Sequence, residues 1–85
     1  MKTIVDIPDY NVERGLSLTW QDGFFIIVEI ADDKTLIKAN SAGLISLANH
    51  LLTLAQSEVP AGHHIHYDDM NSLEDGSSEL IIEKM

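Results

Sequence analysis

The sequence Phe24-Phe25-Ile26-Ile27-Val28-Glu29-Ile30 predicts the central strand of a β-sheet. It is rich in aromatic and β-branched residues, which favour strands. Before it, residues 16–20 alternate apolar with polar side chains, and Gln21-Asp22-Gly23 between two such runs is typical of a hairpin. After it, residues 31–34 supply a turn and residues 35–39 a third strand. This part of the chain therefore predicts a three-stranded antiparallel meander.

Beyond the meander the hydrophobic period becomes helical, from Ser41 to Ser57. Asn40 or Ser41 can cap the start of this helix, and Pro60 prevents its continuation. The apolar stripe consists of Leu44, Leu47, Ala48, Leu51, Leu54 and Ala55. The polar face, which is uncharged, consists of Ser46, Asn49, His50, Thr53 and Ser57. Two interpretations are open. Either this face contacts something other than bulk water, or the helix packs on a small sheet that covers most of it. We favour the second.

Two more strands are predicted after the helix, at residues 63–67 and 79–84. The polar, acidic connection at residues 69–78 is longer than a usual hairpin loop and is expected to be mobile or functional. The expected fold class is α+β, an antiparallel sheet of about five strands (β-β-β-α-β-β) with one long helix packed on one face. Residues 1–85 are expected to form a single domain.

Composition narrows the classes of partner and of chemistry. The chain has no cysteine, which excludes disulfides and thiolate sites. Its net charge is −9, and no lysine or arginine lies between Ala39 and Glu83. Nucleic acids and membrane surfaces, which are negatively charged, are therefore poor candidates as partners. A basic protein is a better candidate. No apolar run is long enough for a membrane span or a signal peptide. We therefore expect a cytoplasmic protein.

Three of the four histidines lie in Gly62-His63-His64-Ile65-His66-Tyr67-Asp68-Asp69. In an extended strand His64, His66 and Asp68 share one face. These three side chains could bind zinc or a similar divalent metal, with Glu79, Glu83 or His50 as a fourth ligand. They could instead form hydrogen bonds that hold a polar sheet face, or belong to a partner-binding surface. We expect no cofactor, and the metal stays an alternative.

One helix covers only one face of the predicted sheet, so Phe25, Ile27 and Ile81 would lie on the uncovered face beside the histidine row. Contiguous exposed apolar residues usually mark an interface. This face is therefore expected to bind another protein or a second copy of the chain. Alternatively, the N-terminal residues 4–7 fold over it.

The second half of the chain resembles the immunity protein 32 family, whose members are predicted to neutralise toxins of bacterial polymorphic toxin systems. The resemblance covers about Ala39 to Glu83 and rests on three stretches of sequence. They are the leucine-alanine helix from Gly43 to Ala55, the stretch Gly62-His63-His64-Ile65-His66-Tyr67-Asp68, and Ser77-Ser78-Glu79-Leu80-Ile81-Ile82. By position, the family's features would be Gly62, His64, His66, Asp68 and Ser78.

The resemblance implies an immunity role. Together with the negative charge and the uncovered sheet face, it leads us to expect a non-enzymatic protein that caps the active surface of a cognate, basic toxin. No nucleophile elbow, phosphate-binding glycine loop or cationic substrate site is present, so no catalytic residue is predicted. The expected partner-binding residues are His64, His66, Asp68, Asp69, Glu74, Asp75, Phe25, Ile27 and Ile81. A small metal-binding domain, or a homodimer without a toxin partner, is the alternative.

Overall fold

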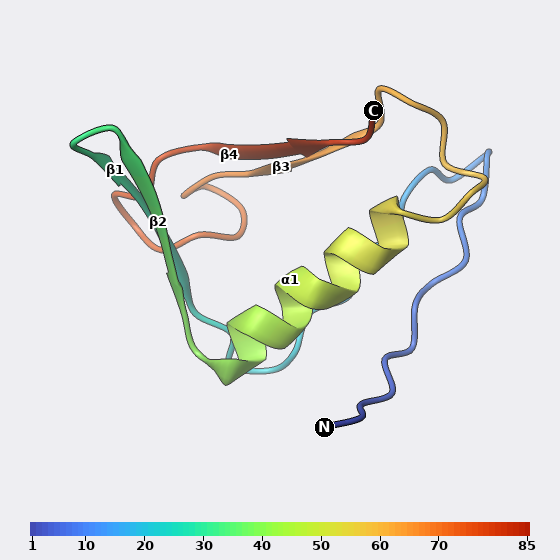
Figure 1. The fold of residues 1–85 in the computed structure, drawn as a ribbon, viewed down its shortest axis with the longest axis horizontal. Helices are drawn as coiled ribbons and strands as arrows, with labels where there is room; N and C mark the ends of the chain where they lie inside the picture. Colours follow the sequence, from blue (N-terminus) through green and yellow to red (C-terminus); the bar gives the residue numbers. More distant parts are fainter.

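The computed structural model describes residues 1–85 and contains one helix and two separate antiparallel hairpins (Figure 1). Strand β1 (Ile26–Ala31) pairs with β2 (Lys34–Ala39), and β3 (His64–Tyr67) pairs with β4 (Leu80–Glu83). Helix α1 (Ser41–Leu54) follows the first hairpin. The predicted α+β class is confirmed, and the prediction of a single sheet of about five strands is wrong.

The β1–β2 turn forms where the sequence predicts it. Asp32 and Asp33 have positive φ angles of 52° and 61°, so both occupy the left-handed region. Consecutive left-handed residues suit the right-handed twist of a two-residue hairpin, and aspartate tolerates this conformation better than most residues. The turn brings Ala31 opposite Lys34 and Ile26 opposite Ala39.

The segment predicted as the first strand, residues 16–20, forms no strand. Side chains of α1 bind the backbone of the N-terminal segment in place of a neighbouring strand. The backbone N–H of Gln21 donates to Ser46 Oγ (2.9 Å), and the carbonyl of Thr19 lies 2.7 Å from His50 Nε2. The apolar members of the alternation still pack against the core without pairing in a ladder. The predicted hairpin at residues 21–23 is therefore a turn that leads into β1.

Helix α1 presents its polar face to the interior, and only Leu47 and Leu54 of its predicted apolar stripe pack against the core. The buried polar side chains are Ser46, Asn49, His50 and Thr53, each no more than 6% exposed. Leu44 and Leu51 of the predicted core stripe are about half exposed, at 56% and 48%. The polar face thus contacts protein rather than bulk water, as one interpretation of the sequence stated.

The N-terminal residues lie beside α1 and not over the outer face of a sheet (Figure 1). Asn49 Nδ2 donates to the carbonyl of Asp6 at 2.7 Å, and Gln56 Nε2 donates to that of Pro8 at 3.0 Å. The alternative in which residues 4–7 cover the uncovered sheet face is therefore wrong.

The loop between β3 and β4 joins the two hairpins. The N–H of Glu74 donates to the carbonyl of Ile26 (3.0 Å), and the N–H of Ser78 donates to that of Val28 (2.8 Å). Ser77 Oγ accepts from the N–H of Val28 at 3.2 Å. These bonds satisfy the second edge of β1 without a regular ladder, which explains why one continuous sheet does not form. The loop therefore has a structural role.

The core lies between α1 and the inner faces of the two hairpins. Its buried apolar residues are Ile26, Val28, Leu54, Val59, Ile65, Tyr67 and Leu73. Only 12 of the 85 residues are buried. Helix α1, with 14 residues, falls short of the length and apolarity that a membrane crossing requires.

Candidate functional site

The outer face of the β3–β4 hairpin carries the histidine row. Ile65 and Tyr67 are 4% and 1% exposed, whereas the intervening His64 and His66 are exposed. This alternation is the period of a strand with one buried face. His66 lies opposite Ile81 in the ladder, so an exposed apolar side chain accompanies the imidazoles.

Gly62 allows the chain to enter this hairpin. Its φ angle is +92°, in the region that glycine adopts without a steric penalty. Its N–H donates to the carbonyl of Lys84 at 2.8 Å, and the N–H of Lys84 donates to the carbonyl of His63 at 2.8 Å. These bonds extend the ladder beyond β3 and β4 and fix the register in which His64 and His66 point outward.

Two carboxylates flank the imidazole of His66. Its Nε2 atom lies 3.6 Å from Glu79 Oε2 and 3.9 Å from Asp68 Oδ2. These contacts are ion pairs only when the ring is protonated, and the three side chains are partly exposed, so each contributes little to stability. The histidine, aspartate and glutamate side chains form no group of three arranged to hold a metal ion. Metal binding by His64, His66 and Asp68 therefore stays a prediction without support from this geometry.

His50, which the sequence offered as a fourth metal ligand, is instead a buried structural residue. It is 0% exposed, and its two ring nitrogens contact Tyr67 Oη (2.8 Å) and the carbonyl of Thr19 (2.7 Å). Burial lowers the pKa of His50 below its ordinary value of 6.5, against the opposing effect of the hydrogen bond to Thr19. Burial also raises the pKa of Tyr67 from 10.0 to about 12. Both side chains are therefore neutral around pH 7.

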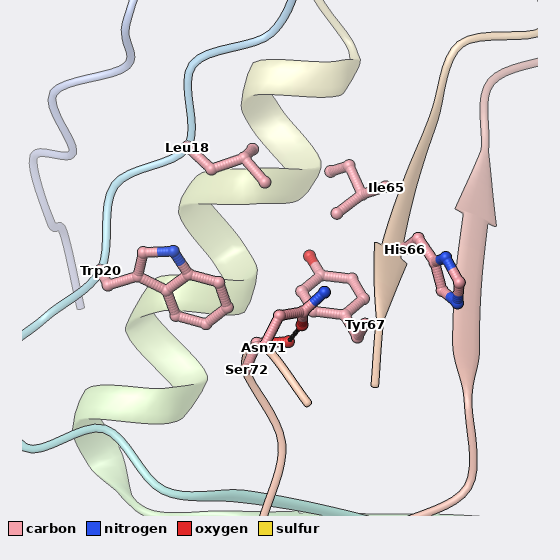
Figure 2. A pocket seen from close by; sticks show the side chains of 7 residues that line it. All are labelled: Leu18, Trp20, Ile65, His66, Tyr67, Asn71 and Ser72. Carbon is pink, nitrogen blue, oxygen red and sulfur yellow. Dashed lines mark hydrogen bonds between the residues drawn. The ribbon is translucent and has the colours of Figure 1, made fainter. Parts of the chain in front are cut away.

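A small open pocket lies between residues 16–20 and the inner face of β3 (Figure 2). Figure 2 shows Tyr67 pointing from β3 toward Trp20 and α1, while the ring of His66 lies on the other side of the strand. The rings of Trp20 and Tyr67 meet edge to face, with centroids 6.2 Å apart. The pocket volume is about 200 Å³, below the roughly 300–1,000 Å³ of ordinary ligand sites. Of its lining residues, Ser72 donates its hydroxyl hydrogen to Asn71 rather than to His66.

The other predicted partner-binding residues lie on different parts of the surface. Phe25 immediately precedes β1 and is 43% exposed, and Ile27 lies in β1 and is half-buried. Asp69 and Glu74 line one shallow pocket in the loop between β3 and β4, and Asp75 follows them, exposed. The predicted set is therefore divided among the β3–β4 face, the acidic loop and β1.

Sequence reasoning missed an apolar exposed surface, the outward face of α1. Leu44, Ile45, Leu51 and Leu52 are each 47–56% exposed. A signal for this surface was present, because the uncharged polar face on the opposite side of the helix was already unusual for a water-facing surface.

Residues 34–85, more than half of the chain, match the model of a family described as immunity protein 32. The chain belongs to the immunity protein 32 family. The match confirms the resemblance seen in the sequence and includes β2, α1, β3 and β4. Neither the curated proteins nor the solved structures contain a match to this chain.

The structure accounts for two of the positions by which the sequence resembles the immunity protein 32 family. Gly62 supplies the left-handed turn into β3, and the backbone of Ser78 holds the loop before β4 against β1. His64, His66 and Asp68 belong to the outer face of the hairpin that these two residues position. The matched region thus contains the exposed histidine row and the Gly62 turn that leads into it, whereas Val28, the partner of Ser78, lies outside the match.

Proposed function

We propose that this chain is an immunity-type protein that binds a cognate bacterial toxin in the cytoplasm and covers the active surface of that toxin. The observation that carries the proposal is the immunity protein 32 match over residues 34–85. The description of the family names an immunity role and no reaction, and the chain is proposed to act by binding alone.

The outer face of β3–β4 is the proposed contact surface. His66 and Ile81 lie opposite each other there, and Ile81 is 56% exposed. An exposed isoleucine with an amphipathic imidazole beside it can supply the apolar centre of an interface, where a few side chains contribute most of the binding energy. Phe25 and Ile27 are proposed to extend the contact on the first hairpin.

The acidic loop is proposed to guide the toxin to this face. Asp69, Glu74 and Asp75 follow β3, in a chain with a net charge of −9 and no cation between Ala39 and Glu83. Opposite charges accelerate association more than they slow dissociation, and salt screens them. A basic toxin, such as a nuclease, fits this surface.

Co-expression with a toxin domain that co-purifies with this chain from its own host tests the proposal. Growth of the toxin-expressing bacterium should be restored by the wild-type chain. Ile81→Ala should weaken binding to the purified toxin domain by about 30-fold, the equivalent of about 2 kcal/mol for a central anchor. Ile30→Ala is the matched control, because Ile30 is similarly exposed (61%) but lies at the tip of the other hairpin.

Two results would contradict the proposal. Failure of the soluble wild-type chain to restore growth would remove the immunity role, and equal effects of Ile81→Ala and Ile30→Ala would remove the assigned surface. Asp69→Asn combined with Asp75→Asn should slow association at low salt and change dissociation little. A salt-independent association rate in the wild type would contradict the steering role of the loop.

A further inference from the structure

The outward face of α1 is an uncharged apolar stripe. Its residues are Leu44, Ile45, Ala48, Leu51, Leu52 and Ala55. At 100° per residue they span an arc of about 120°, the width of a helix face that normally packs against another element. The four large side chains are each 47–56% exposed. In Figure 1 no other segment of the chain crosses the near side of α1.

The stripe is symmetric about Ala48. Leu44 and Leu52 lie four residues to either side of Ala48, and Ile45 and Leu51 lie three residues to either side. Seven residues away on each side, the exposed Ser41 and Ala55 are again small. The order along the helix is therefore small, large, large, small, large, large, small, and it is the same in both directions.

A stripe that is the same in both directions matches a second copy of itself in antiparallel orientation. With a two-fold axis at Ala48, Leu44 of one copy meets Leu52 of the other, and Ile45 meets Leu51. Ala48 meets its own equivalent, where a small side chain lets two helices approach closely. Every large residue thus contacts a large residue and every small residue a small one, as an isologous two-fold interface requires.

The distribution of charge favours this face over the rest of the surface as the place where two copies meet. Each chain has a net charge of −9, which opposes self-association over most of its surface. Residues 41–57 carry no charged side chain, so the two copies would meet where this repulsion is weakest. Antiparallel helices also place the positive end of each helix dipole beside the negative end of the other.

We infer that the chain forms a symmetric homodimer through the outward faces of two antiparallel α1 helices. The dimer is independent of the proposed immunity function. The inner face of α1 contacts Tyr67 through His50, so the outward face of α1 and the outer face of β3–β4 point away from each other. Each dimer therefore leaves both β3–β4 faces free for partners.

Sedimentation velocity of the purified chain over a range of concentrations measures the dimer directly. The wild type should sediment as a dimer, and Ala48→Glu, which places two carboxylates at the two-fold axis, should sediment as a monomer. Ala48 is exposed, so this variant should retain the wild-type circular dichroism spectrum. Ile81→Glu is the matched control on the β3–β4 face and should remain dimeric.

Disulfide cross-linking tests the orientation, since the chain has no native cysteine. Ala48→Cys should cross-link to a covalent dimer under mild oxidation, whereas Ala61→Cys, exposed before β3, should not. Mixed Ser41→Cys and Ala55→Cys chains should form the mixed dimer in preference to either homodimer, because a disulfide requires Cα atoms within about 7 Å.

Two results would overturn the inference. The first is a wild type that stays monomeric at its highest soluble concentration; if its toxin neutralisation is also lost in Ala48→Glu, the α1 face is a toxin-binding surface. The second is a dimer that Ile81→Glu dissociates and Ala48→Glu does not, since it would place the interface on the sheet. Toxin neutralisation by wild type and Ile81→Ala is measured separately, so the two proposals can fail independently.

Discussion

The Nδ1 atom of His50 in α1 lies 2.8 Å from the hydroxyl oxygen of Tyr67 in β3, and both side chains are at most 1% exposed. His50 Nε2 lies 2.7 Å from the carbonyl oxygen of Thr19, which can only accept a hydrogen. The neutral ring therefore carries its proton on Nε2 and donates it to Thr19. Nδ1 then accepts the proton of the Tyr67 hydroxyl. These two hydrogen bonds connect the N-terminal segment, α1 and β3.

The two pKa shifts predict that stability falls at both ends of the pH range. Below pH 6.5 the unfolded chain protonates at His50 while the folded chain, whose pKa is lowered, does not, so the unfolding free energy falls as pH decreases. Above pH 10 the unfolded chain loses the Tyr67 proton while the folded chain keeps it until about pH 12, so stability falls as pH rises through that window. Urea unfolding at a series of pH values measures both effects. The imidazole NMR signals of His50 should not titrate near pH 6.5 while the chain stays folded, and a normal titration would contradict the assignment.

Tyr67→Phe should destabilise the chain by about 1–3 kcal/mol, because it leaves His50 Nδ1 buried without a partner. Tyr10→Phe is the matched control. The Tyr10 hydroxyl lies 3.4 Å from His63 Nε2 in a half-buried setting, so its loss should cost much less. Chemical denaturation compares the two variants, and equal effects would show that the His50–Tyr67 bond is not specially important.

Asn40→Ala should destabilise the chain by more than the about 1 kcal/mol typical of an N-cap. Asn40 Oδ1 accepts from the N–H groups of Gly43 (2.8 Å) and Phe25 (3.0 Å), and its Nδ2 donates to the carbonyl of Gly23 (2.9 Å). The side chain therefore holds the residues that precede β1 as well as capping α1. Asn40→Asp keeps the accepting oxygen and should retain more of the thermal stability than Asn40→Ala. Equal melting temperatures for the two variants would contradict this.

Gly43→Ala should destabilise the chain by about 1–3 kcal/mol, although alanine is the better helix former. A Cβ atom at this position would lie 2.7 Å from the carbonyl oxygen of Phe25 and 2.9 Å from Ile26 Cγ1, closer than real Cβ contacts. The backbone of α1 would have to move away from β1. Ser41→Ala, at an exposed position of the same helix turn, should change the unfolding free energy by less than about 0.5 kcal/mol. A stabilised Gly43→Ala variant would show that the helix shifts without cost.

Zinc should leave the thermal midpoint unchanged, because His64, His66 and Asp68 are not arranged as a set of three ligands. A site specific to the folded state would raise the midpoint as zinc concentration increases. Thermal scans with zinc, nickel and chelator measure this directly. A saturable increase that disappears in His66→Ala would restore the metal-site hypothesis.

Local sequence signals predicted the helix and the last two strands, together with the inward and outward faces of β3. Alternation in residues 64–67 gave the correct buried pair, and Asn40 and Pro60 bracketed the helix, which ends at Leu54. These features depend on period and capping, which are local properties.

The orientation of α1 could not be predicted from its own residues. The polar side chains at Ser46, Asn49 and His50 bind backbone groups of a segment 25 to 43 residues away in the sequence. An apolar stripe normally faces the core, and here tertiary hydrogen bonds of the polar face accompany a stripe that is mostly exposed. For the same reason residues 16–20 alternate like a strand and form none, and the first hairpin of the predicted meander is absent.

The hydrogen bonds from α1 to residues 6–21 have a consequence for dissecting the chain. The region that matches the family begins at residue 34, yet Ser46, Asn49 and His50 find their partners before that boundary. A fragment of residues 34–85 would also lack β1, the only strand paired with β2. In that fragment the polar side of the helix would lack its hydrogen-bond partners in the N-terminal segment, and nothing would determine which side faces inward. The boundary of shared ancestry in this chain is therefore not a boundary of cooperative folding.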